Sequence, residues 1–137
     1  LLLPSSFKEQ LGDALEEGFV LRPSLYDKCL ELFGMSDWRA MQNKLGKLNP
    51  FKQENVMLIR RFNAGARMVK VDASGRLQIP KDLMEKGGLV KEVVMTALTD
   101  RMQIWDKTLS EQENERFSEA DLAKALSEKL GANDFID

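Results

Sequence analysis

The sequence predicts an α+β protein, because its strand-like and helix-like segments come in blocks. Two stretches, residues 19–33 and 66–105, contain short apolar or alternating runs bounded by Gly, Pro, Ser and Asp, which are typical of strands. An amphipathic helical pair lies between these stretches, and another amphipathic helix follows them. The order is therefore a β-rich module, a helical pair, a second β-rich module and a helical tail.

The first block contains a short helix and two strands. Phe7 and Leu11 share one face of a helix over residues 5–11. Apolar runs predict strands at 19–21 and 29–33. Between these strands lie the turn-forming residues Pro23, Ser24 and Asp27. We expect Cys29, inside the second apolar run, to be a buried thiol.

Two amphipathic helices follow the first block. The first has Ser36 as its N-cap and ends before Asn49–Pro50, and the second covers residues 53–64. Their apolar faces consist of Trp38, Met41, Leu45 and Leu48 in the first helix and Val56, Ile59 and Phe62 in the second. We expect Trp38, the strand residue Trp105 and the methionines (including Met41, Met57, Met84, Met95 and Met102) to pack in the core.

The second block contains four strands and a short helix. The strands are predicted at 66–71, 76–79, 93–98 and 102–105, with turns at 73–75 and 99–100 and a helix at 81–86. After this block the last helix carries one apolar face and stops at Gly131. That face is formed by Phe117, Leu122, Leu126 and Leu130.

The two blocks share an internal repeat. Residues 1–9 align with residues 77–85, with proline at the fourth position of each, and Gly12 falls on Gly88. Two short gaps then bring 19–21 onto 93–95 and 29–33 onto 101–105. The segment 69–76 has no counterpart, because Leu1 pairs with Leu77. We therefore expect that the first copy lacks its first strand and turn, and that the sequence is a fragment of a longer one.

Charge is sorted along the chain, although the formal net charge is only −2. Residues 52–81 carry seven positive side chains against two acidic ones, and residues 106–137 carry nine acidic side chains against four basic ones. A basic middle suits a surface that faces a polyanion, but solvated faces would look the same. Arg60 and Arg61, on the second helix of the pair, fit a surface toward DNA, a neighbouring subunit or solvent.

Composition makes an enzyme improbable. The chain has no histidine, so the commonest general base and metal ligand is missing, and its single cysteine cannot form an intrachain disulfide or a cysteine-based zinc site. The lone thiol suggests a reducing compartment. No apolar run approaches the length of a membrane-spanning helix. We expect no catalytic residues, metal, cofactor, small-molecule substrate or membrane partner.

One local motif has functional potential, the segment Asp72-Ala-Ser-Gly-Arg76-Leu-Gln-Ile-Pro80. Gly75 permits a tight turn, and Asp72 and Ser74 can bond to the backbone of that turn. Such a turn would hold Arg76 on a rigid support, where its guanidinium could bind phosphate or the acceptor edge of guanine. Alternatively, Arg76 pairs with Asp72 across the turn and only stabilises it.

The sequence resembles the MraZ family, bacterial transcriptional repressors of the division and cell-wall gene cluster within the wider AbrB/SpoVT-like group. That family carries two Asp-x-x-Gly-Arg-x-x-x-Pro elements, and residues 72–80 fit the second. Further matching segments are Leu1-Leu-Leu-Pro4 (the tail of the first element), Cys29–Phe33 with Trp38, Phe62–Ala66, Gly88–Val94 and Ile104–Asp106. The resemblance spans residues 1 to about 110.

The resemblance implies two tandem swapped-hairpin β modules in pseudo-twofold arrangement. It also implies ring-shaped homo-oligomers in the cytoplasm, associated with the nucleoid, that bind direct repeats in promoter DNA. Arg76 is then the expected DNA contact, with Lys70 and Ser74 as lesser contacts and with Asp72 and Gly75 forming the turn.

Four segments follow from the pattern and the resemblance together. They are a first module at 1–51, a connecting helix at 52–65, a second module at 66–110 and an acidic helical tail at 111–137. The function expected is repression of transcription through sequence-specific DNA binding. Two alternatives remain: an AbrB-like antitoxin whose tail inhibits a toxin, and a protein-interaction module without DNA binding.

Overall fold

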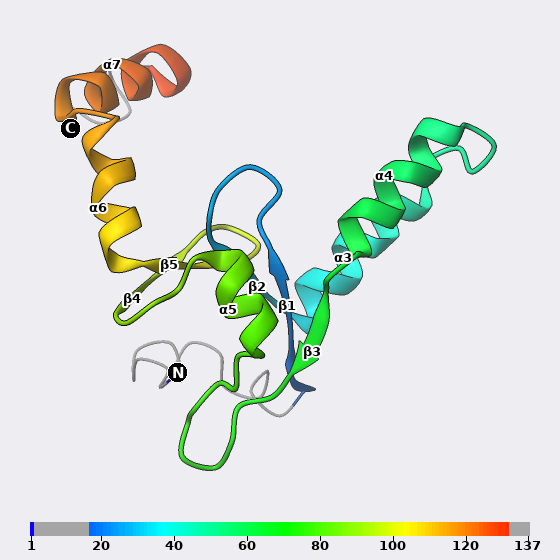
Figure 1. Ribbon diagram of the computed structural model, residues 1–137. Helices are drawn as coiled ribbons and strands as arrows, with labels where there is room; N and C mark the ends of the chain where they lie inside the picture. Colours follow the sequence, from blue (N-terminus) through cyan, green and yellow to red (C-terminus); the bar gives the residue numbers. More distant parts are fainter. Residues whose placement is uncertain (2–16, 132–137) are drawn as a thin grey trace. The chain divides into compact units, whose positions relative to one another are not determined.

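The computed structural model describes residue 1 and residues 17–131 (Figure 1). Its elements are, in chain order, β1 (Phe19–Pro23), β2 (Leu30–Gly34), α3 (Met35–Gly46), α4 (Gln53–Asn63), β3 (Arg67–Val69), α5 (Lys81–Gly87), β4 (Val93–Ala97), β5 (Met102–Asp106), α6 (Lys107–Glu115) and α7 (Glu119–Leu130). The fold is α+β, as predicted. The helix predicted over 5–11 lies outside the described residues. The chain divides into unit 1 (Leu1–Asp106) and unit 2 (Lys107–Asp137).

The strands of unit 1 form one sheet in the order β3-β1-β2-β5-β4, with antiparallel neighbours throughout. The strands predicted at 19–21, 29–33, 93–98 and 102–105 are confirmed within one or two residues. The strand predicted at 66–71 is shorter, and residues 76–79 form no strand of their own. Leu77 pairs with Val71 in an isolated antiparallel bridge.

The strand registers agree with the internal repeat. Phe19 pairs with Gly34 in the first copy, and their equivalents Val93 and Asp106 pair in the second. Between the copies, β2 and β5 meet symmetrically about Glu31 and Gln103, which are equivalent positions. Leu1 and Leu77, also equivalent, exchange two backbone hydrogen bonds. Pairing of each residue with its own counterpart is what a pseudo-twofold axis requires.

The sheet buries apolar side chains on both faces. On one face, Phe19, Leu21, Leu30, Leu32, Val69, Met102 and Ile104 pack with Leu77, Leu83 and Leu89. Leu83 belongs to α5, which lies against β1, β2 and β5. On the other face, Val20 and Phe33 pack with Phe62, and Trp38 and Met41 of α3 cover them in part. The predicted packing of Trp38 in the core is confirmed.

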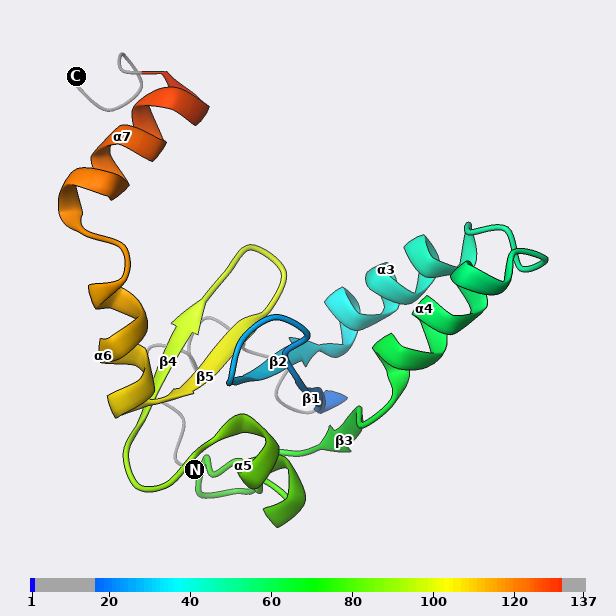
Figure 2. The ribbon, with the colours of Figure 1, turned by 45° about the horizontal axis from the view of Figure 1, so that its top comes forward.

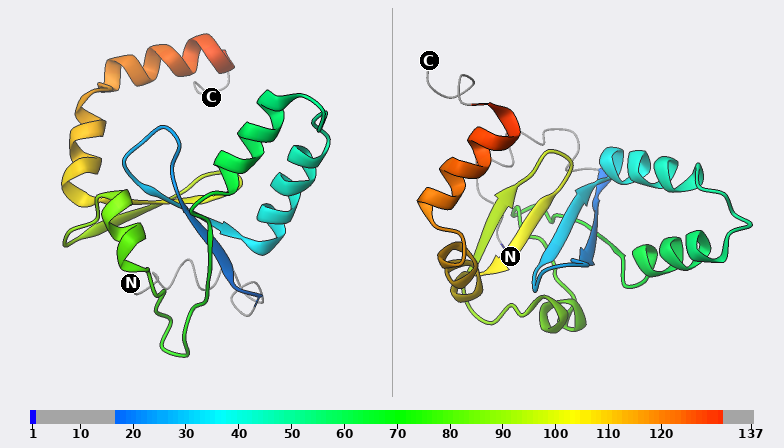
Figure 3. Two further views of the ribbon diagram at one scale, coloured as in Figure 1. Left: turned by 45° about the vertical axis from the view of Figure 1, so that its right-hand side comes forward. Right: turned by 90° about the horizontal axis from the view of Figure 1, so that it is seen from above.

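Helices α3 and α4 extend away from the sheet as a hairpin (Figures 2 and 3). No residue of α3 is buried, and α4 buries only Phe62. The predicted N-cap Ser36 is wrong. Strand β2 passes directly into the helix at Gly34, so Gly34 holds the cap position and Ser36 lies inside the first turn.

The single helix predicted at the end of the chain is two helices. Between α6 and α7, Ser118 accepts a hydrogen bond from the N–H of Asp121, whose carboxylate accepts one from the N–H of Ser118. This capping box starts a new helix and leaves Phe117 in the connection. Helix α6 begins at Lys107, directly after β5, as α3 begins directly after β2. In chain order, the α6–α7 pair therefore holds the place in the second copy that α3–α4 holds in the first.

Candidate nucleic-acid interface

The segment between β3 and α5 forms a tight hairpin held by Asp72. One carboxylate oxygen, Oδ1, accepts hydrogen bonds from the N–H groups of Ser74 and Arg76, each at 2.9 Å. The backbone N–H of Asp72 donates to the carbonyl of Arg76, and that of Gly75 donates to the carbonyl of Asp72, both at 2.9 Å. Gly75 has φ +81°, a conformation that a side chain disfavours. The turn thus needs both Asp72 and Gly75.

The hairpin has an inner and an outer face. Its inner side chains alternate along the two strands, with Val69 and Leu77 buried and Val71 and Ile79 packed against the same core. The intervening residues Lys70, Arg76 and Gln78 are exposed. The hairpin extends from unit 1 between β3 and α5 (Figure 1). A rigid apolar base therefore supports an outer face with two cations and an amide.

Arg76 is free to bind a ligand. Its side chain is exposed, and within the described part of the chain no ion pair joins it to Asp72 or to another acid. The Asp72 carboxylate instead accepts backbone N–H groups of the turn. The alternative in which Arg76 only stabilises the turn through an ion pair is therefore wrong. Lys70 and Ser74 are also exposed on the hairpin.

Other cations of the basic middle segment differ in their surroundings. Arg67, in β3, forms an ion pair of 2.6 Å with Asp82 at the start of α5. Arg60 and Arg61 are exposed in the last turn of α4. Arg67 is thus partly neutralised at the base of the hairpin, whereas the outer face carries the positive charge of Lys70 and Arg76.

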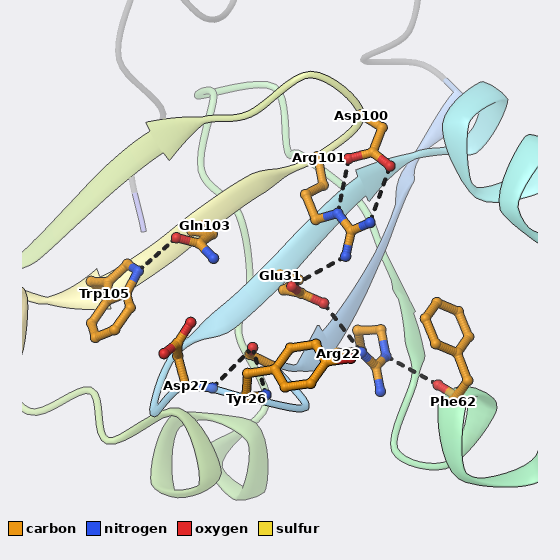
Figure 4. Close-up of polar contacts among 10 residues, drawn as sticks. Arg22, Tyr26, Asp27, Glu31, Phe62, Asp100, Arg101, Gln103 and Trp105 are labelled. Carbon is orange, nitrogen blue, oxygen red and sulfur yellow. Dashed lines mark hydrogen bonds and ion pairs between the residues drawn. The ribbon is translucent and has the colours of Figure 1, made fainter. Parts of the chain in front are cut away.

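A second polar cluster lies on the sheet face shared with α3 and α4, and sequence reasoning missed it (Figure 4). Glu31 pairs with two arginines, Arg22 at 3.1 Å and Arg101 at 3.3 Å. Arg22, 2% exposed, also donates from Nε to the carbonyl of Phe62 at 3.0 Å. Asp100 accepts two hydrogen bonds from Arg101. The cluster links β1, β2, β5 and the end of α4.

The charges of this cluster are balanced by pairing. Burial lowers the pKa of Arg22 from its ordinary value, against the opposing effect of Glu31. The hydrogen bond to Asp100 raises the pKa of Arg101, and the same bond lowers the pKa of Asp100. Each guanidinium also lies over an aromatic ring, Arg22 over Phe62 at 4.4 Å and Arg101 over Phe33 at 4.7 Å. These arginines are structural and do not point to a nucleic acid.

Cysteine, tryptophan and methionine side chains were predicted to lie in the core, and most of them are buried or half-buried. Cys29 is fully buried, as predicted, and burial raises the pKa of its thiol to about 12. Trp105 is half-buried and donates from Nε1 to Gln103 at 2.9 Å. The prediction that the methionines fill the core is wrong for Met57 of α4, which is 53% exposed, and for Met68 of β3, which is 70% exposed. In the described residues, no helix is long and apolar enough to cross a membrane.

Comparison with known proteins shows the family of the chain that carries this hairpin. Residues 62–133 match a family model described as "MraZ protein, putative antitoxin-like". The chain belongs to the MraZ family. It is 41% identical to a protein of Christiangramia forsetii over 98% of this chain and 86% of that protein. It is 42% identical to one of Flavobacterium psychrophilum over 96% of this chain and 83% of the relative. A relative from Acetivibrio thermocellus is 37% identical over 95% of this chain and 86% of its own length.

All three relatives bear the name "Transcriptional regulator MraZ". The family assignment makes this chain a transcriptional regulator. The matched segment includes the whole Asp72–Arg76 hairpin and continues through α7. The resemblance to the MraZ family seen in the sequence is thereby confirmed.

Proposed function

We propose that this MraZ-family chain represses transcription by binding promoter DNA through the outer face of the Asp72–Arg76 hairpin. The target would be direct repeats upstream of the division and cell-wall gene cluster, bound in the cytoplasm by a nucleoid-associated homo-oligomer. The single observation that carries this proposal is the exposed guanidinium of Arg76, which pairs with no acid among the described residues, on a turn whose backbone is fixed by Asp72.

The chemistry of the outer face suits DNA. Arg76 has the planar donor fork that matches a phosphate or the O6 and N7 atoms of guanine. Lys70 and Ser74 supply a second charge and a hydroxyl for phosphate oxygens. Gln78, which sequence reasoning did not include, shares the exposed face and has the side chain that pairs with adenine. Exposure of every second residue along a hairpin could have identified it.

One hairpin offers few contacts, so affinity would come from several hairpins acting together. Each phosphate neutralised by a cation releases counterions, which makes binding weaken steeply as salt is raised. An oligomer on repeated sites multiplies both the affinity and this salt dependence. A shallow salt dependence would contradict the multivalent part of the proposal.

Replacement of Arg76 tests the proposal. We expect Arg76→Ala to weaken binding to a duplex with the repeats by at least about tenfold, because each contact of this type contributes about 1–3 kcal/mol. Binding is measured by fluorescence anisotropy, with a scrambled duplex alongside. The control is Arg39→Ala, which removes an exposed arginine from α3. Equal affinity of wild type and Arg76→Ala would exclude the hairpin as the DNA contact.

The description of the matched family also names an antitoxin-like character. An antitoxin would need a second protein held in stoichiometric complex. Purification of the chain from its own cells, followed by native mass measurement, distinguishes the two functions. A complex that contains only this chain supports the regulator alone, and a stable complex with a second polypeptide supports the antitoxin.

A further inference from the structure

Unit 2 has too little core of its own. None of its described residues, 107–131, is buried. Its longer helix, α7, has 12 residues, and isolated helices shorter than about 12–15 residues are marginal in water. The capping box at Ser118 and Asp121 defines where α7 starts, but it adds only a modest stabilisation. A helix pair of this size therefore needs a surface on which to bury its apolar residues.

Helix α7 carries an apolar stripe for such a contact. Leu122, Leu126 and Leu130 recur at every fourth position and so lie on one side of the helix. Leu122 is 47% exposed and Leu130 is 55% exposed. Glu119 and Asp121 give the first turn of α7 a negative charge. The stripe has the spacing with which helices occupy apolar grooves in other proteins.

Unit 1 contains a groove with the complementary properties. A cavity of about 310 Å³ lies between the β1–β2 loop and α4. Its apolar lining comes from Leu25, Tyr26, Leu58 and Phe62, and its polar lining from Arg22, Glu31 and Arg101. Tyr26 is 92% exposed, and Leu25 and Leu58 are about half exposed. Figure 4 shows Tyr26 and Phe62 beside the paired Arg22 and Glu31.

The charges beside the groove are opposite to those in the first turn of α7, Glu119 and Asp121. Arg60 and Arg61 lie in the last turn of α4, which lines the groove through Leu58 and Phe62. Opposite charges at the rim of a contact raise the association rate and select the partner, while the apolar centre supplies most of the free energy. Groove and stripe are therefore both apolar, and the end of α4 and the start of α7 carry charges of opposite sign.

We propose that the groove between the β1–β2 loop and α4 binds α7 of a second copy of this chain. The leucine stripe of α7 would cover Leu25, Tyr26 and Leu58. Because groove and helix are different surfaces, the contact is head-to-tail and repeats from copy to copy until a ring closes or a filament forms. The inference deepens the proposed function, since it rests on the homo-oligomer invoked there and names its contact.

Complementation between two variants tests the contact. Leu58→Glu places a charge in the apolar lining of the groove, and Leu122→Glu places one in the stripe of α7. We expect each full-length variant to be a monomer by light scattering after gel filtration. The wild-type chain is expected to have a mass above that of a dimer. A 1:1 mixture of the two variants is expected to form a dimer, because one intact groove can still bind one intact α7. A monomeric wild type, wild-type mass for either variant, or a mixture that stays monomeric would each overturn the proposal.

Matched controls separate the contact from general effects on folding. Met57→Glu changes the neighbouring, 53% exposed residue of α4, and Ala120→Glu adds the same charge to α7 off the stripe. Both are expected to keep the wild-type mass. Tyr26→Glu is a second groove variant and is expected to behave like Leu58→Glu. Because Tyr26 is 92% exposed in a loop, its replacement should change the stability of the fold little. Unchanged circular dichroism verifies the fold of each variant.

The assembly and the DNA contact can fail separately. Arg76→Ala is expected to keep the wild-type mass while it loses DNA affinity. Leu58→Glu is expected to lose the assembly, and its DNA affinity falls only through the loss of multivalency. If Arg76→Ala binds DNA normally but complementation succeeds, the proposed function is wrong and the contact stands. If Arg76→Ala fails to bind and complementation fails, the proposed function stands and the contact is wrong.

Discussion

Glu31 is the residue that holds the polar cluster of unit 1 together. Its two carboxylate oxygens pair with two arginines, Arg22 of β1 and Arg101 of the turn before β5. The sequence places Glu31 inside an apolar run, and Arg101 lies 70 positions away, so no local pattern could predict the cluster. The Asp72 turn, by contrast, could be predicted from the sequence, because all of its hydrogen bonds join residues within four positions. That Arg76 is exposed, and that it forms no ion pair with Asp72, required the structure.

Removal of Glu31 should destabilise the protein strongly. Glu31→Ala leaves Arg22, 2% exposed, without its anionic partner. Loss of one partner of a buried ion pair costs about 3–5 kcal/mol. The control Asp82→Ala breaks the exposed Arg67–Asp82 pair and should cost at most about 1 kcal/mol. Urea denaturation measures the free energy of unfolding of both variants. Equal decreases in Glu31→Ala and Asp82→Ala would show that burial of the cluster does not matter for stability.

The elements with strong local signals were predicted well from sequence. Strands β1, β2, β4 and β5 have apolar runs, and α4 and α5 have clear ends, so their predicted bounds agree closely with the structure. Two failures have physical causes. Ser36 looked like a cap, but β2 joins α3 without a loop at Gly34. The last helix was predicted as one, although Ser118 and Asp121 have the spacing of a capping box that starts a new helix.

Close contact between elements explains one glycine of α5. A Cβ atom at Gly87 would lie 2.6 Å from Cγ of Leu30 in β2. Leu30 is fully buried, so it cannot move away at low cost. We expect Gly87→Ala to lower the free energy of unfolding by about 1–3 kcal/mol.

A second glycine provides the control for this contact. Gly46 ends α3, and a methyl group at this position would have no neighbouring atom within 4 Å. Gly46→Ala should therefore be neutral or stabilise the protein by up to about 1 kcal/mol. Thermal melting followed by circular dichroism measures both variants. A Gly87→Ala protein as stable as wild type would show that α5 does not pack this closely on β2.

At the scale of the whole molecule, the internal repeat organises both proposed surfaces. The registers of β1–β2 and β4–β5 correspond, and each pair of strands is followed directly by two helices. The sequence showed the repeat in the strands but not in the helices, because α6 has one apolar residue, Leu109, where α3 contacts the sheet through Met35, Trp38, Met41 and Leu45. The repeat thus produces helical surfaces of different charge in one chain, as a head-to-tail contact between copies requires.

The central claim, that the Asp72–Arg76 hairpin contacts DNA, is tested most directly by photocrosslinking. A duplex with the promoter repeats and photoreactive thymine analogues is irradiated with the full-length chain, and the crosslinked peptides are identified by mass spectrometry. We expect crosslinks within residues 70–78, lost when unlabelled specific duplex competes. Crosslinks confined to α3, α4 or unit 2, with none in residues 70–78, would contradict the account.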